Sequence, residues 1–144
     1  MRLSTKCRYG LRAMIDLAIF SVDKQVALKD VAERQDVSLK YLEQEFSLLK
    51  RAGLVRSVKG SKGGYMLARP ADDIRVGEII RSLEGDLVVI DIDTNASSDI
   101  RSFLNQAVWE PLNHDVEIFL ESLSLSSLAE DYINKSSEGG MFYI

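Results

Sequence analysis

Apolar residues between positions 39 and 51 recur at the three- and four-residue spacing that marks one side of an α-helix. They form a stripe made of Leu39, Leu42, Phe46 and Leu49. The opposite face is polar and comprises Lys40, Gln44, Ser47 and Arg51. Ser38 precedes the stripe and can cap the helix with its hydroxyl, and Gly53 can end it in the left-handed conformation. The pattern predicts an amphipathic helix with one polar face.

Two short apolar or β-branched runs, residues 54–58 and 65–67, follow this helix and bracket a tip of glycine and positive charge. This arrangement predicts a β-hairpin. Upstream, residues 28–35 predict a short helix, and residues 36–37 form the tight turn of a helix-turn-helix. The inward side of that short helix comprises Leu28, Val31 and Ala32. A helix-turn-helix followed by a basic hairpin favours DNA binding over the alternative, a small α+β core with a solvated lysine loop.

The flanking segments predict further helices. Ser4 can cap a first helix that runs to about Phe20. Pro70 ends the hairpin, because it cannot continue a central strand, and residues 76–83 then predict a short helix closed by Gly85. Residues 87–93 are expected to be extended and residues 94–98 to form a loop. The inward face of the first helix is expected to comprise Leu11, Met14, Ile15 and Ala18.

A long amphipathic helix is predicted from Asp99 onward, with a kink at Pro111, which removes a backbone amide. Its apolar stripe is too large for a lone arm, so we expect it to form a homodimer interface. The stripe comprises Ile100, Phe103, Leu104, Ala107, Val108, Leu112, Phe119 and Leu123. Residues 126–133 predict a last short helix, in which Leu128 and Ile133 are available for packing.

These elements give a mainly α fold with a small β-hairpin wing: a winged helix-turn-helix domain plus a long dimerisation helix. The expected division is a DNA-binding domain over residues 1–85 and a linker over 86–98. The dimerisation helix and the short C-terminal helix follow over 99–135, and a flexible tail over 136–144.

Composition adds limits to this picture. The chain has 144 residues, of which 46% are hydrophobic, and no apolar run approaches the length that crosses a membrane. No secretory signal peptide is visible at the N-terminus, and a single Cys is typical of a reducing compartment. We therefore expect a cytoplasmic protein with no membrane partner.

The formal net charge of −4 conceals a strong asymmetry. Residues 1–69 contain 14 Lys and Arg against 7 Asp and Glu, whereas residues 70–144 contain 4 against 15. A basic half is the electrostatic property that phosphate binding requires, and an acidic half is better suited to protein contacts. The asymmetry predicts double-stranded DNA as the partner of the N-terminal half.

Several spaced motifs resemble the Rrf-two family of bacterial winged-helix regulators. They lie at residues 3–11, 38–44, 53–55, 59–65 and 76–80, and the likeness extends over nearly the whole chain. The resemblance implies a homodimeric repressor or activator that binds an imperfect palindrome. It also implies that Ser38, Lys40, Tyr41 and Gln44 contact the major groove and that Lys59 enters the minor groove.

The chemistry of these residues agrees with that implication, because Gln can pair with adenine, Lys can reach guanine, and a narrow minor groove favours a cation. Tyr41 and Tyr65 have an alternative role in packing, and Arg8 is either a phosphate contact or part of a solvated face. The candidate DNA-binding residues are Arg8, Ser38, Lys40, Tyr41, Gln44, Ser47, Arg51, Lys59, Gly60, Ser61, Lys62 and Gly63.

Family members with an iron–sulfur cluster carry three closely spaced Cys after the position of Gly85 and a His at the start of the long helix. This chain has no Cys after Cys7, and Phe103 and Gln106 fill the third Cys position and the His position. A cluster needs thiolate ligands, and His114 is better explained as a solvated or interface residue. We therefore expect no iron–sulfur cluster, no metal and no other cofactor.

The last four residues, Met141, Phe142, Tyr143 and Ile144, form an apolar end behind a glycine-rich tether. This ending resembles that of the cluster-free, CymR-type branch of the family, repressors of cysteine metabolism that act with cysteine synthase. The resemblance implies a partner-binding tail whose terminal carboxylate docks on that enzyme. The alternatives are a frayed terminus and a strand tucked against the body.

Cys7 is a second candidate sensor, because Lys6, Arg8 and the helix N-terminus would favour its thiolate. The alternative is a small, half-buried helix residue. Two broader alternatives remain: a redox- or small-molecule-sensing regulator of other genes, and a winged-helix adaptor that does not bind DNA. An enzyme is not expected, because the single His and single Cys lie far apart and no phosphate-binding loop is present.

Overall fold

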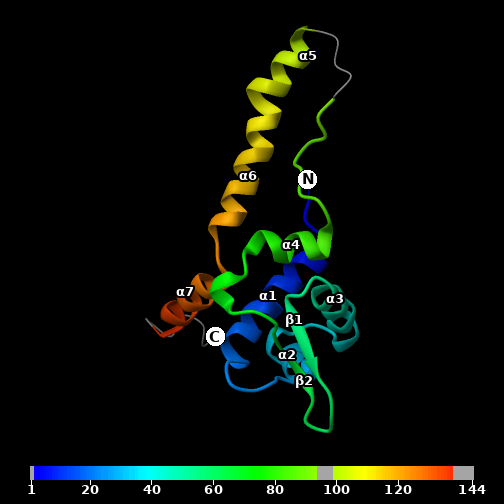
Figure 1. Cartoon of the computed structure of the whole chain (residues 1–144), viewed down its shortest axis with the longest axis vertical. Helices are drawn as coiled ribbons and strands as arrows, with labels where there is room; N and C mark the ends of the chain where they lie inside the picture. The colour runs from blue at the N-terminus through cyan, green and yellow to red at the C-terminus, as the bar shows by residue number, and fades with distance from the viewer. Residues whose placement is uncertain (1, 94–98, 138–144) are drawn as a thin grey trace.

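The computed structural model describes residues 2–93 and 99–137. Four helices and a hairpin form a compact body, from which α5 and α6 project as one long rod, and α7 returns to lie against α1 (Figure 1). The fold class is confirmed: mostly helical with a two-stranded antiparallel hairpin. The elements are α1 (Thr5–Phe20), α2 (Leu28–Gln35), α3 (Leu39–Arg51), β1 (Val55–Val58), β2 (Gly64–Leu67), η1 (Ala71–Asp73), α4 (Val76–Glu84), α5 (Asp99–Leu104), η2 (Asn105–Trp109), α6 (Glu110–Ser122) and α7 (Leu125–Ser137).

Helix α1 is the centre of the body, because α2, α3, α4, α7 and β2 all pack against it. Its buried side is rotated from the predicted face, since Leu11, Ile15 and Ala18 are only half-buried. Ser4 stands at the N-cap, but its hydroxyl contacts the Glu84 carboxylate instead of capping. The residues that are buried are Cys7, Gly10, Ala13, Met14, Asp16 and Leu17. A helix with neighbours on several sides buries more than one stripe.

Helices α2 and α3 confirm the predicted helix-turn-helix. Ser38 caps α3 by accepting a hydrogen bond from the Tyr41 amide at 3.1 Å, and Asp36 turns the chain in the left-handed conformation. The buried side of α3 differs from the predicted apolar stripe at two positions. Leu39 is 39% exposed, whereas Glu45 is 1% exposed. The three remaining predicted core residues are fully buried: Leu42, Phe46 and Leu49.

The hairpin pairs β1 with β2 from Val55↔Leu67 to Val58↔Gly64. A short bridge joins it to the loop before α2, because Val26 and Tyr65 exchange two backbone hydrogen bonds of 2.9 and 2.8 Å. A Cβ at position 64 would lie 2.2 Å from the Val26 carbonyl oxygen, so only glycine fits there. The wing is therefore a continuation of the body and not a detached loop.

The long helix is continuous but irregular. The predicted kink takes the form of η2, a π-helical segment that precedes Pro111. Proline has no N–H to donate to the preceding turn, which accounts for a widened turn at this point. Leu123 is not part of the rod, which is a correction: it is the extended residue after α6 and packs beside Val76 and Ile80.

Helix α7 is longer than predicted and lies elsewhere than expected. Leu125 is fully buried in the main core, and Ala129 is buried as well, whereas Ile133 is 46% exposed. The helix therefore belongs with the body and not with the dimerisation helix. Residues 87–93 form no strand, and the predicted loop at 94–98 and the end of the tail lie outside the described residues.

Candidate nucleic-acid interface

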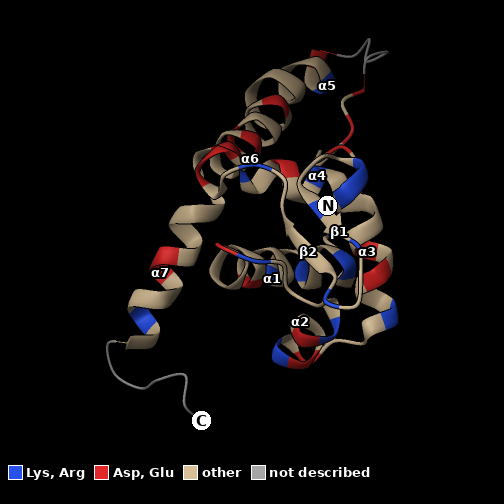
Figure 2. Cartoon of the chain, turned by 60° about the horizontal axis from the view of Figure 1, so that its bottom comes forward, with Lys and Arg blue, Asp and Glu red and all other residues tan. Residues whose placement is uncertain are grey.

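The predicted polar face of α3 points to solvent. Lys40, Gln44, Ser47 and Arg51 are all exposed, as is Ser38 at the cap. Figure 2 shows most basic segments on the body with α1, α3 and the hairpin, and acidic segments along α6. The arrangement presents a polar helix next to a basic wing.

The two tyrosines differ. The Tyr65 ring packs edge to face on Phe46 at 4.9 Å between centroids, so its role is in the core. Tyr41 is half-buried and contacts the Tyr9 ring at 5.6 Å, and the Arg12 guanidinium lies 5.1 Å from the centroid of that ring. Tyr41 thus joins α3 to α1 at the edge of the exposed face, and a DNA contact by its hydroxyl stays a prediction.

The wing tip is exposed at Lys59, Gly60, Ser61 and Lys62. Two glycines shape it: Gly60 has a φ of 119°, and a Cβ at Gly63 would lie 2.4 Å from the Val58 carbonyl oxygen. The Gln25 side-chain amide donates to the Lys62 carbonyl at 2.6 Å, so the tip is also held from the loop before α2. Two cations are therefore carried on a turn of defined shape.

A half-buried ion pair joins α1 to α2, the helix that precedes α3. Asp16 is 2% exposed, and both its oxygens accept from Arg34 at 2.8 Å, while the Gln35 amide donates to it at 3.0 Å. Arg34 also stacks on the Phe20 ring at 4.1 Å. Sequence analysis missed Asp16, since a lone acid beside an apolar stripe gives no signal of its partner.

Glu45 is the second polar residue that sequence analysis missed. Within the described part of the chain, neither of its carboxylate oxygens has a hydrogen-bond partner. Burial raises the pKa of Glu45 from 4.5 to about 7, and the nearby Lys6 ammonium acts in the opposite direction. Its signal in the sequence was spacing, since position 45 falls between Leu42 and Leu49 on the inner side of α3.

The redox hypothesis for Cys7 rested on a favoured thiolate, and the structure contradicts that premise. Cys7 is 2% exposed, and burial, followed by the Glu84 and Glu45 carboxylates, raises its thiol pKa to about 11. The thiol is therefore protonated at neutral pH and behaves as a small core residue. Arg8, the next residue, is exposed on the first turns of α1, and its contact with phosphate stays a prediction.

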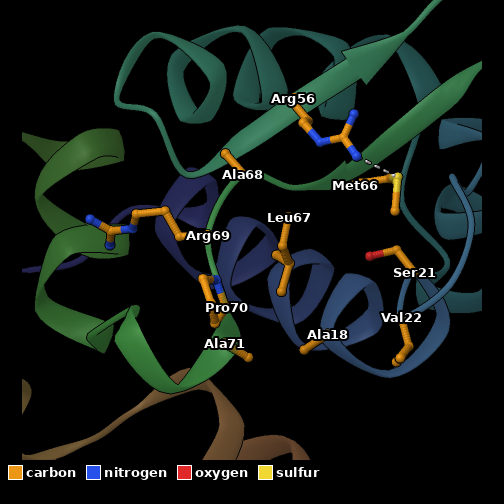
Figure 3. Close-up of a pocket in the computed structure, with 10 residues that line it drawn as sticks. All are labelled: Ala18, Ser21, Val22, Arg56, Met66, Leu67, Ala68, Arg69, Pro70 and Ala71. Atoms are coloured by element: carbon orange, nitrogen blue, oxygen red, sulfur yellow. Dashed lines mark hydrogen bonds between the residues drawn. The ribbon is translucent and has the colours of Figure 1, made fainter.

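A cavity of about 500 Å³ lies between the end of α1 and β2 (Figure 3). Its lining is mainly apolar, and its two arginines do not converge on it. Arg69 extends away toward Glu78, to which it donates at 2.8 Å, and Arg56 contacts the sulfur of Met66. The one hydroxyl in the lining, that of Ser21, donates to the Leu17 carbonyl at 2.6 Å. The polar groups of the lining therefore do not converge as those of an active site do.

The projecting rod carries apolar side chains in contact with solvent. Ile100, Phe103 and Phe119 are 74%, 66% and 61% exposed, and Ile118, which was not predicted, is also exposed. Val108, Leu112 and Ala107 are exposed, whereas Leu104 is half-buried. Unpartnered apolar residues at this density are typical of a protein–protein interface.

Among the described residues, no group of three His, Cys, Asp or Glu side chains is placed to hold a metal ion. The positions compared with cluster ligands, Phe103 and Gln106, are exposed on the rod, as is His114. Within the same residues, no helix is both long and apolar enough to cross a membrane.

Comparison with known proteins identifies the family. Residues 3–131 match Rrf2, the Rrf-two family named above, whose description is "Iron-dependent Transcriptional regulator". The chain belongs to the Rrf2 family. Its members are DNA-binding transcription regulators, so this chain is a DNA-binding regulator and not an enzyme. The adaptor alternative is thereby removed.

The relatives that resemble the chain include regulators named IscR and regulators named CymR. IscR of Cereibacter sphaeroides, an HTH-type transcriptional regulator, is 42% identical over 137 residues, which cover 91% of this chain and 88% of that protein. Among solved structures, CymR, described as the global cysteine regulator of B. subtilis, has a TM-score of 0.80 at 36% identity and covers 90% of this chain and 97% of its own. IscR of T. potens has a TM-score of 0.78 at 40% identity, with coverages of 100% and 97%.

The expectation of no cofactor is corrected by these findings. The Rrf2 family is described as iron-dependent, and IscR regulators stand among the relatives in both sequence and structure, so an iron–sulfur cofactor is plausible for this chain. The absence of Cys after Cys7 excludes only one ligand pattern, that of three closely spaced Cys. The residues present do not identify a ligand set, because the one Cys of the chain is buried and protonated. We therefore assign no ligands and derive no step through such a group.

Proposed function

We propose that this Rrf2 member acts as a homodimer on a palindromic operator, with α3 in the major groove and the wing tip in the minor groove. The observation that carries the proposal is the exposed polar face of α3, capped by Ser38 and flanked by a basic wing fixed to the body. A recognition helix of this kind contacts base edges with its first turns. Such a regulator acts where the chromosome lies, which for a bacterial protein is the cytoplasm.

Each exposed side chain has a role in this proposal. Gln44 forms two hydrogen bonds with an adenine, and Lys40 reaches a guanine. Ser38 and Tyr41 contact the major groove beside them, and Ser47 and Arg51 contact phosphates, together with Arg8 on α1. Lys59 and Lys62 neutralise charge at the minor groove, where Gly60, Ser61 and Gly63 allow the backbone to approach.

The experiment is selection of binding sites from random duplex DNA with the full-length chain. We expect enrichment of one palindromic motif, with half-sites whose centres are about one helical turn or a multiple of it apart. A pool that remains random after several rounds, or a motif with a single half-site, would contradict the proposal.

We propose further that the regulated genes belong to sulfur and cysteine metabolism and that the chain represses them. The support is the likeness to CymR of B. subtilis and the apolar end at residues 141–144. In this proposal residues 141–144 dock on cysteine synthase, with Tyr143 supplying buried area. A titration of cysteine synthase into the full-length chain and into a chain without residues 141–144 tests it. Binding by neither form would remove this partner.

The likeness to IscR favours a second candidate, a regulator whose operator binding responds to iron. The test is the metal content of chain purified without oxygen, together with operator affinity before and after chelation. Stoichiometric iron and a change of affinity on chelation support this candidate. Iron-free chain that binds the operator equally with and without chelator would remove it and leave the cysteine candidate.

A further inference from the structure

Residues 86–93, here called the strap, leave α4 at Gly85 and run alongside the projecting rod (Figure 1). The strap has no regular secondary structure, yet its backbone groups are held by side chains of the rod. Near its far end, the Asn105 side-chain amide donates to the Asp93 carbonyl at 3.1 Å.

Asn113, in the first turn of α6, makes the central attachment. Its Oδ1 accepts from the Val89 amide at 2.8 Å and from the Ile90 amide at 3.2 Å, and its Nδ2 donates to the Ile90 carbonyl at 2.9 Å. One half-buried side chain thus supplies three hydrogen bonds to a segment that has no strand partner. The side-chain amide takes the place of a neighbouring strand.

The rod is attached to the body at a second place, the end of α6. The Val76 amide donates to the Leu123 carbonyl at 2.9 Å, and Arg81 forms an ion pair with Glu121. From Asn113 to Glu121 is eight residues, or about 12 Å of helix. An attachment at one end only would let the rod pivot, and a second attachment about 12 Å away fixes its inclination.

We propose that Asn113 is a positioning residue for DNA recognition: by clamping the strap to α6, it fixes the inclination of the rod to the body. The inference rests on the proposed function, in which two rods pack together in the homodimer. The inclination of each rod then sets the distance between the two α3 helices, and that distance sets the spacing of operator half-sites. Asn113 would therefore select half-site spacing without touching DNA.

The test uses the full-length dimer and three variants. Asn113→Leu keeps the size and removes all three bonds, whereas Asn113→Asp keeps the acceptor and loses the donor to Ile90. Asn134→Leu, at an exposed position on α7, is the matched control. Affinity is measured for the selected operator, for operators with half-sites moved by single base pairs, and for an isolated half-site.

Because each bond contributes about a two- to tenfold factor, the preference of Asn113→Leu for the best spacing should fall by about tenfold or more. The affinity for an isolated half-site should not change, and Asn113→Asp should be intermediate. The control should keep the wild-type preference. An unchanged spacing preference in a folded, dimeric Asn113→Leu would overturn the inference, and if that variant does not fold, an unchanged Asn113→Asp decides in the same way.

A second readout separates this inference from the proposed function. Spin labels attached at Ser102→Cys on the rod and at Glu33→Cys on the body report the distance between these two sites by pulsed electron paramagnetic resonance. The native cysteine, Cys7, is buried and is not a labelling site. Asn113→Leu should broaden that distance distribution in the absence of DNA. If wild-type chain selects no operator, the proposed function fails while this readout still tests the clamp, and an unchanged distribution in both Asn113 variants rejects it.

Discussion

Glu45 lies where α3 meets α1 and α4, and its surroundings explain both its burial and its titration. The residues that face it include Lys6 and Cys7 on α1, while Gly10 leaves room for its carboxyl group. The exposed face of α3 could be predicted from the sequence, because polar side chains at helical spacing are an intrinsic pattern. The burial of Glu45 and Asp16 could not, since it depends on which helices pack around them.

Glu45 should make the stability of the body depend on pH. Its pKa is raised from 4.5 to about 7 in the folded chain, so the folded state favours the protonated form. The stabilisation is full below about pH 4.5 and is lost as the pH rises through 7, by about 3 kcal/mol at most. Urea unfolding at pH 5 and pH 8 measures it. Glu45→Gln should remove most of this difference, the exposed control Glu43→Gln should keep it, and an equal difference in Glu45→Gln would refute the assignment.

The two lysines at the wing tip, Lys59 and Lys62, give a second prediction for single side chains. Replacing Lys59 and Lys62 together by Ala should weaken binding to all DNA sequences alike and reduce the slope of log affinity against log salt by about 2. Titrations at several salt concentrations, with operator and with unrelated DNA, measure both effects. Lys135→Ala on α7 is the control, because it removes one positive charge, as each wing substitution does, from a site outside the wing. A loss confined to the operator would show that these lysines contact bases instead.

At the scale of elements, helices α1 to α4 and the hairpin follow from periodicity and from capping and turn residues. Three features did not: the rotated face of α1, the π-helical turn before Pro111 and the docking of α7 on the body. Each depends on contacts between elements distant in the chain. Leu125 illustrates this, because nothing local indicates that it enters the main core.

The junction between the wing and the body gives the prediction at this scale. Gly64→Ala should destabilise the chain by about 1–3 kcal/mol, because a Cβ there meets the Val26 carbonyl oxygen and must displace the bridge. Operator affinity should fall with it, since the wing shifts. Thermal unfolding checks the change against Ser61→Ala at the exposed tip. A Gly64→Ala chain as stable as Ser61→Ala would mean that the bridge can relax without cost.

The whole molecule separates two tasks between two regions of opposite charge. The body carries most of the basic residues, and the acidic rod exposes apolar side chains. The strap and the end of α6 join the two regions at two places. In the function that we propose, the body faces DNA and two rods pack together, so that their packing determines the placement of two α3 helices. The rod and most of its stripe could be predicted from the sequence, whereas the prediction for Leu123 was wrong because the helix ends before it.

The rod should be required for dimerisation. Phe103→Asp and Phe119→Asp should each raise the dimer dissociation constant by about 100-fold, because each loses a buried phenyl ring and introduces a charge into an apolar interface. Sedimentation equilibrium measures the constant. Val22→Asp, at a strongly exposed apolar position on the body, should leave it unchanged. Dimers of unaltered strength in both rod variants would place the interface elsewhere.

If α3 determines the DNA sequence that is bound, wild type and Gln44→Ala should differ in which operator variants they bind. Affinities are measured for the selected operator and for every symmetric single-base variant of its half-site, at one salt concentration. We expect Gln44→Ala to lose about 1–3 kcal/mol of discrimination at one position in each half-site and to keep it elsewhere. A Gln44→Ala chain that discriminates among all variants as the wild type does would contradict it.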